Sequence, residues 1–243
     1  MLLNLSIGRV YGIDSIVELL IIVIASIIAY YSYKIYKLIN DKDYRLFSWA
    51  FLSLAVSFIF KILSNLTIYY SITIERANLI FTLVHELEAI EQVNFLSLIL
   101  YKTTLILGFL ILFFIITKTN DKQKRLLFIY LSAVAVLFSI YFDFVLHLTA
   151  VFLLFSITDY FYQNYKKLKN NNAFLVFIGF VIILVSQIFF IFEPINLWIY
   201  LISELLILVG FLCLLINQIK LKHEQKKNKT RSNKRYIGNI KKK

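Results

Sequence analysis

The chain has 243 residues, of which 60% are hydrophobic and only 16% are charged. Soluble globular proteins carry roughly 45 to 50% apolar and about 25% charged residues, so this composition excludes an ordinary water-soluble fold. The formal charge of +12 would suit nucleic-acid binding, but the charges fall in short clusters between long apolar runs, a pattern typical of membrane-spanning segments.

The apolar runs predict an all-α fold, a polytopic membrane bundle of seven transmembrane helices within residues 1–219. About 20 apolar residues, rising 1.5 Å each, cross a hydrocarbon core of about 30 Å. The first run opens with Asp14 and has no basic segment ahead of a short apolar core, so we expect a spanning helix and not a cleaved signal peptide. The expected helices cover about residues 13–33, 46–69, 95–117, 126–142, 144–162, 173–192 and 196–219.

The stretch 126–162 is too long for one span. As a single helix it would measure about 55 Å, nearly twice the hydrocarbon core. Asp143 lies near its middle, and a charged residue is expected at a membrane boundary. The sequence therefore predicts two helices with a tight turn at Asp143.

Residues 75–94 have a different character. Glu86, Glu88 and Glu91 alternate there with Leu87 and Ile90 and with other apolar residues spaced three and four apart, which indicates one apolar stripe on a helix. We expect an extracytoplasmic amphipathic helix that lies on the membrane surface or packs over the bundle.

The basic residues predict the orientation in the membrane. The loops 34–45, 118–125 and 166–169 and the tail 220–243 together hold 22 of the 26 Lys and Arg residues. Cytoplasmic segments carry such an excess, so we expect a multi-pass protein of the cell membrane with its N-terminus outside and its C-terminus in the cytoplasm.

The tail 220–243 holds eleven of these basic residues and little apolar content, so we expect disorder in solution. Its simplest interpretation is a solvated segment that fixes topology. Contact with anionic lipid of the cytoplasmic leaflet is an alternative, as is a membrane or cytoplasmic protein partner, whereas a nucleic-acid partner is not expected.

Two lysines, Lys61 and Lys102, fall inside expected spans. An ionisable group there costs at least about 2.5 to 3.5 kcal/mol and usually faces the bundle and a partner. Counted from the helix ends, both lie in the outer half of the bilayer with other polar residues at similar depth. We expect an outward-facing polar chamber built from Lys61, Lys102, Glu18, Glu204, Gln187, Asn65, Asp143 and His147.

The same residues have a purely structural interpretation, which the sequence leaves open. They could form ion pairs, for example Lys61 with Glu204, or the lysines could extend to the membrane surface. Asp143 and His147, four residues apart, could form a carboxylate–histidine pair for proton transfer. His85 and Glu88 would supply half of a metal site, but no second histidine accompanies them, so we expect neither a metal nor a cofactor.

These patterns favour a non-enzymatic sensor-like or accessory module that passes ligand occupancy to a partner. The alternative is a small transporter or channel subunit for an anion or a proton-coupled solute, although such proteins often use helices broken by Pro or Gly. A third hypothesis is an intramembrane enzyme with His147 and Asp143 or Glu204 as acid and base. A retinal pigment is disfavoured because residues 196–219 contain no lysine for a Schiff base.

Overall fold

The structure is a computed structural model that describes residues 2–76, 84–118 and 121–240, with side chains described over 14–70, 90–118, 121–196 and 198–220. All regular elements in these ranges are helices, which confirms the predicted all-α class. They are α1 (Leu2–Ile39), α2 (Lys42–Arg76), α3 (Val84–Thr117), α4 (Lys122–Phe138), α5 (Asp143–Leu168), α6 (Asn171–Ile191), the short 3-10 helix η1 (Glu193–Ile195) and α7 (Leu197–Ile240).

Six of the helices contain segments long and apolar enough to cross a membrane, so the chain is a multi-pass integral membrane protein. The candidate spans are Asp14–Ile39, Lys42–Tyr70, Ile90–Thr117, Asp143–Leu168, Asn171–Ile191 and Trp198–Lys220. The other span expected from the sequence corresponds to α4, which has 17 residues and is not one of these six.

The predicted turn at Asp143 is confirmed. α4 ends at Phe138, and α5 begins at Asp143. The start of α4 differs from the expectation, since Lys122, placed in a loop by its charge, begins the helix. Asp121 explains this early start, because its side chain accepts a hydrogen bond of 3.0 Å from the backbone N–H of Gln123 and so caps the helix.

The structure does not contain the separate amphipathic helix expected over 75–94. Residues 75 and 76 end α2, residues 77–83 lie outside the described part of the chain, and residues 84–94 form the start of α3. From the sequence alone, the charged residues of this stretch indicate a helix lying on the surface. A helix that continues beyond the bilayer accommodates them equally well, because its first turns lie in water.

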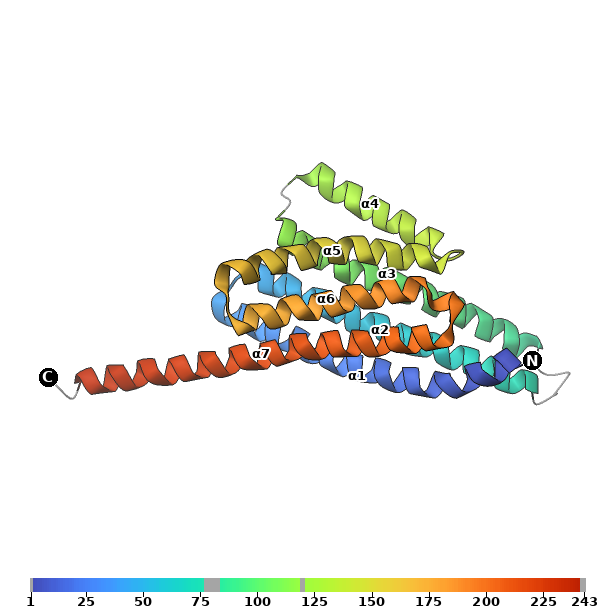
Figure 1. Ribbon diagram of the computed structural model, residues 1–243, viewed down its shortest axis with the longest axis horizontal. Coiled ribbons are helices and arrows are strands. Elements are labelled where there is room, and N and C mark those ends of the chain that lie inside the picture. Colours follow the sequence, from blue (N-terminus) through green and yellow to red (C-terminus); the bar gives the residue numbers. More distant parts are fainter. Residues whose placement is uncertain (1, 77–83, 119–120, 241–243) are drawn as a thin grey trace.

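Figure 1 shows that each of the seven α-helices runs opposite to the one before it, so the connections alternate between two ends of the bundle. The turns at 40–41 and 169–170 lie at one end, where α3 also ends and α4 begins and toward which α7 runs. We call this the basic end, because it carries the basic loops of the sequence. The opposite end, called the polar end here, carries the α4–α5 turn and η1.

The helices pack mainly in antiparallel pairs. α2 packs against both α1 and α3, α6 against both α5 and α7, and contacts between α1 and α7 join the two groups. Among the described residues, α4 makes few contacts, which are with α3 and α5, and Figure 1 shows it at the periphery. The hydrophobic core includes Phe211 of α7, which meets Phe51 and Phe58 of α2 edge-on at ring distances of 5.9 and 6.2 Å.

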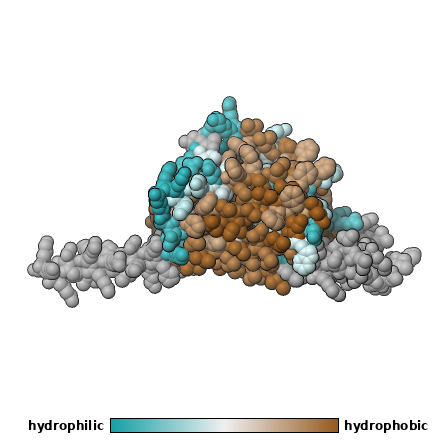
Figure 2. Space-filling view, viewed as in Figure 1, coloured by the Kyte–Doolittle hydropathy of each residue, from teal (hydrophilic) through white to brown (hydrophobic). Residues whose placement is uncertain are grey.

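The outer surface is apolar as well. Large side chains such as Trp49, Phe155 and Leu126 are exposed, and Figure 2 shows a broad hydrophobic face over the bundle, with hydrophilic residues gathered beside the basic end. In water such a surface would be unfavourable. In a bilayer, the lipid tails cover this apolar surface.

Two glycines allow α6 and α7 to approach closely. A Cβ atom built on Gly210 would lie 2.5 Å from Ile183 Cγ1 and 2.9 Å from the carbonyl oxygen of Gly179. A Cβ atom on Gly179 would lie 3.1 Å from the carbonyl oxygen of Gly210. Small residues at facing positions are a common basis of helix packing in membranes, where apolar burial alone provides no driving force between helices.

α7 continues through Ile240, whereas its composition predicted disorder for 220–243. Lys, Arg and Gln are good helix formers, and a helix already nucleated by the span before it can extend at low cost. Figure 1 shows this part of α7 projecting beyond the bundle at the basic end.

Candidate functional site

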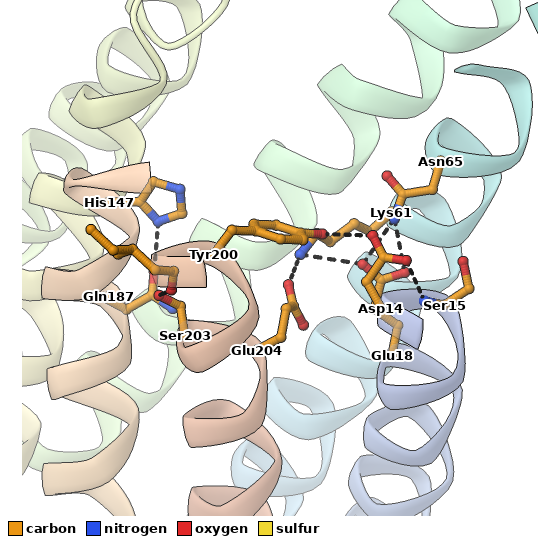
Figure 3. A network of polar contacts seen from close by, with 11 residues as sticks. Asp14, Ser15, Glu18, Lys61, Asn65, His147, Gln187, Tyr200, Ser203 and Glu204 are labelled. Atoms are coloured by element: carbon orange, nitrogen blue, oxygen red, sulfur yellow. Dashed lines mark hydrogen bonds and ion pairs between the residues drawn. The ribbon is translucent and has the colours of Figure 1, made fainter. Parts of the chain in front are cut away.

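Lys61 of α2 is the centre of a buried charge cluster near the polar end. Its ammonium group donates to Glu204 Oε1 of α7 and lies 3.3 Å from Glu18 Oε1 of α1. Figure 3 shows the contacts of the ammonium group with both carboxylates as dashed lines. Both glutamate side chains are fully buried or nearly so. The Lys61–Glu204 pair proposed from the sequence is therefore present, and a third helix contributes to it.

Two polar side chains support the carboxylates. Asn65 donates from Nδ2 to both carboxylate oxygens of Glu18, at 3.1 and 3.2 Å, because four residues along α2 place it on the face of Lys61. The Tyr200 hydroxyl donates to Asp14 Oδ2 at 3.1 Å. Asp14 and Tyr200 were not among the predicted site residues. The spacing of Asp14 and Glu18, four residues apart on α1, was the signal that could have identified Asp14.

Aromatic rings surround the ammonium group of Lys61. Its Nζ lies 5.7 Å from the ring centre of Tyr101, and 5.2 Å from those of Phe190 and Tyr200. These are cation–π distances, and such contacts are strongest when water is excluded. The rings therefore help to hold a charge that would otherwise be costly at this depth.

Lys102 of α3 forms the second ion pair. Its Nζ lies 2.6 Å from Asp143 Oδ1 and also donates to the backbone carbonyl of Ser139. Lys102 is buried, whereas the Asp143 side chain is 75% exposed. The pair thus joins the interior to the surface at the α4–α5 turn, and this exposure makes it less costly than the buried cluster at Lys61.

His147 of α5 pairs with a different residue from the one predicted. Its Nδ1 lies 2.9 Å from Gln187 Oε1, and its ring stacks on Phe190 at 4.8 Å. Asp143, its expected partner, is bound to Lys102. The structure therefore does not assemble the carboxylate–histidine pair. Phe190, which also meets Tyr200 edge-on, links His147 to the cluster around Lys61.

A cavity of about 300 Å³ lies between the two ion pairs. Lys61, Lys102, Asn65, Asp143 and His147 line it, as the predicted chamber requires. Glu18, Glu204 and Gln187 do not reach its wall, but each contacts a residue that does. Further polar lining comes from Asp14, Ser64, Tyr101, Glu193 and Tyr200.

Carboxyl groups outnumber ammonium groups around this cavity. Three carboxyl residues line it, and two more lie behind Lys61, whereas the described cations there are Lys61 and Lys102. Glu204 Oε2 is buried without a hydrogen-bond partner. An uncompensated carboxylate is costly in a low-dielectric interior, so the site favours the binding of protons or of another cation. The five carboxyl groups belong to Asp14, Glu18, Asp143, Glu193 and Glu204.

Glu193 in η1 lines the cavity and lies outside the candidate spans. Burial raises the pKa of its carboxyl group from 4.5 to about 7, although the nearby Lys61 charge lowers it. Glu193 thus changes charge close to neutral pH. The charge of the cavity wall consequently depends on pH in this range.

The described residues contain no group of three or more His, Cys, Asp or Glu side chains that is arranged to hold a metal ion. His85 and Glu88 are the two residues that could supply half of a metal site, and their side chains are not among those that the structure describes. A metal centre therefore has no support in the part of the chain that the structure describes.

Comparisons of the chain with protein-family models, with curated proteins and with solved structures find no match. A function cannot be transferred from a relative on this basis. The interpretation of the site consequently rests on its chemistry and on its place in the bundle.

Proposed function

We propose that the chain is a seven-span protein of the cell membrane that binds a small, amino-bearing solute in the cavity at its polar end and transmits occupancy through α7. It acts as a sensor-like or accessory module and not as an enzyme. The observation that carries the proposal is the cavity of about 300 Å³ whose surrounding carboxyl groups outnumber its lysines. Both lysines are already paired, so neither is free to attract an anion.

The seventh span is α4. Its 17 residues measure about 25 Å at 1.5 Å per residue, slightly less than a hydrocarbon core of about 30 Å, and a bilayer adapts to such a mismatch at modest cost. The directions of its neighbours support this assignment: α3 and α5 both run toward the basic end. The chain can only do this if α4 returns it to the polar end.

The orientation follows from the basic residues. Their concentration at one end supports a cytoplasmic basic end, with the polar end and the N-terminus outside. The tail beyond 220 then lies on the cytoplasmic side of the membrane, where the leaflet is anionic.

Cysteine labelling tests this topology. In a Cys213→Ser background, we expect Tyr141→Cys and Ile195→Cys to react with an impermeant maleimide added outside intact cells, because both native side chains are exposed at the polar end, by 83% and 75%. Ser232→Cys is expected to react only after the membrane is opened. Labelling of position 232 from outside would show that the orientation is the reverse of the proposed one. Protection of position 141 would show that α4 is not a seventh span.

The ligand class follows from the cavity wall. An ammonium group can bind Asp14 and Glu193, while the rings of Tyr101 and Tyr200 offer aromatic faces to a cation. The proposed ligand is a cation, whereas the sequence suggested an anion as the solute of a transporter. The lysines do not attract an anion, because Glu204 and Glu18 neutralise Lys61 and Asp143 neutralises Lys102. The Tyr200 and Glu204 side chains belong to α7, which leads directly to the basic end. Binding that displaces either side chain therefore acts on the helix that carries the tail.

Asp14→Asn tests the binding site. We expect ethanolamine, used as a small cationic probe, to bind the purified protein in nanodiscs about tenfold or more weakly after this change, since a charge-assisted hydrogen bond contributes roughly 1.5–3 kcal/mol. Isothermal titration calorimetry measures the affinity. Asp159→Asn is the matched control, because Asp159 is an exposed carboxylate on α5 outside the cavity lining. Acetate should not bind, and tighter binding of acetate than of ethanolamine would reject the proposal.

Transport of the same solute is a second candidate. It is favoured by a second cavity at the basic end, since a carrier needs access from both sides. Radiolabelled ethanolamine flux into proteoliposomes, lost in Asp14→Asn, would favour transport, whereas binding without flux would favour the sensor-like module.

A further inference from the structure

A second cavity, of about 510 Å³, lies at the basic end of the bundle. Its wall combines residues of α2, α3, α5, α6 and α7, so it lies among the helices and not on the outside of one of them. None of its lining residues belongs to the cavity at the polar end. Its volume suits a small organic ligand.

Two buried amides of α7 in its wall each have a carbonyl oxygen without a hydrogen-bond partner. Asn217 is 5% exposed and Gln218 is 7% exposed, and the carbonyl oxygen of each amide is unpaired. Leaving a buried acceptor unpaired is unfavourable, and an apolar residue of similar size would avoid the cost. Two adjacent residues that line one cavity thus each carry an unpaired acceptor, which a ligand that donates hydrogen bonds would satisfy.

The remaining lining defines the ligand further. Asp41 and Asp43 lie in the wall, and neither makes an ion pair with a described side chain. They give the cavity a local negative charge although the surrounding loops are basic. Four aromatic residues supply apolar surface for the body of a ligand: Tyr44, Phe47, Tyr160 and Phe161.

We infer that this cavity binds an organic primary amine with an apolar body, whose N–H groups donate to the Asn217 and Gln218 carbonyls while Asp41 and Asp43 balance its charge. The site is separate from the cavity at the polar end and does not depend on the function proposed for it. The amine could be a free metabolite or the ethanolamine head group of a lipid. Both present the same ammonium group to the same acceptors.

Tyramine tests the inference, because it joins a primary amine to an aromatic ring. The titration is done in phosphatidylcholine nanodiscs with the Asp14→Asn protein, in which the polar-end cavity is impaired. We expect tyramine to bind, and Asn217→Leu and Gln218→Leu each to weaken binding about tenfold or more. Gln163→Leu is the matched control, since it removes an exposed amide of α5 that does not line the cavity.

Asp43→Asn provides a second variant that does not threaten folding. The helix cap at this position uses the Asp43 backbone N–H and the Asp41 side chain, so changing the Asp43 carboxylate leaves the cap in place. We expect weaker tyramine binding at unchanged melting temperature. Asn217→Leu should also raise the melting temperature while it weakens binding, because it removes an unpaired buried carbonyl.

Nanodiscs that contain phosphatidylethanolamine distinguish the two sources of the amine. If the head group occupies the site, this lipid raises the melting temperature of the Asp14→Asn protein but not of the same protein with Asn217→Leu added, and it competes with tyramine. If the ligand is a free amine, tyramine binds equally well in both lipid compositions. The inference is wrong if neither tyramine nor the lipid has an effect, or if the effects survive in the Asn217→Leu/Gln218→Leu double variant. Since Asp14→Asn is present throughout, failure here leaves the polar-end proposal untouched.

Discussion

Lys61→Met is expected to destabilise the protein by about 3 to 5 kcal/mol, the cost typical of breaking a buried ion pair by removing one partner. The substitution keeps most of the side-chain volume but leaves Glu204 and Glu18 buried without their cation. The rings around the ammonium group cannot replace it. The unfolding free energy, measured by denaturation in mixed micelles, should show this loss.

Two further variants separate the charge effect from general damage. Glu204→Gln added to Lys61→Met should recover a large part of the lost stability, because it removes one uncompensated carboxylate. Lys102→Met should cost less than Lys61→Met, since its partner Asp143 is 75% exposed and can be hydrated. Equal losses at Lys61 and Lys102, with no recovery in the double variant, would argue that the ion pairs contribute no specific stability.

Gly210→Val is the second substitution for which we expect a large effect. Its Cβ would lie 2.9 Å from the carbonyl oxygen of Gly179 and 2.5 Å from Ile183 Cγ1, and the first of these atoms belongs to the backbone. α6 and α7 would have to separate, at a cost of about 1 to 3 kcal/mol or more. We expect a lower melting temperature and weaker ethanolamine binding, because the shift moves Tyr200 and Glu204.

Val209→Ile is the control for this prediction. Val209 is the neighbouring residue on α7 and is 44% exposed, so an added methylene has room on the outer surface. A melting temperature lowered equally by Val209→Ile and Gly210→Val would mean that α7 tolerates no added volume anywhere. Unchanged stability in Gly210→Val would mean that the close approach of the two helices is not required.

The polar-end site shows what sequence reasoning can and cannot identify. Lys61 and Lys102 stood out because a charge inside an apolar run is costly and requires a partner. Their partners were harder to assign, since residues at similar depth on different helices are equivalent until the helices are arranged around one axis. Lys61 could be matched with Glu204, but the contribution of Glu18 depends on how α1 packs against α2.

His147 illustrates the limit of local spacing. Asp143 and His147 are four residues apart and share a face of α5, which made them an apparent pair. Lys102 from α3 binds Asp143 instead, and Gln187 from α6 binds His147. Contacts between helices thus outweighed a contact that spacing along one helix would have allowed.

The sequence by itself determined the membrane setting, the helical class, the turn at Asp143 and the segregation of basic loops, because all of these follow from hydropathy and charge read along one dimension. Only the tertiary structure decided which polar residues share a cavity, that Glu18 and Glu204 lie behind Lys61, and that Asn217 and Gln218 face a second cavity. The physical reason is that each of these depends on the rotation of one helix relative to another, which is set by packing at positions such as Gly179 and Gly210 and leaves no local pattern in the chain.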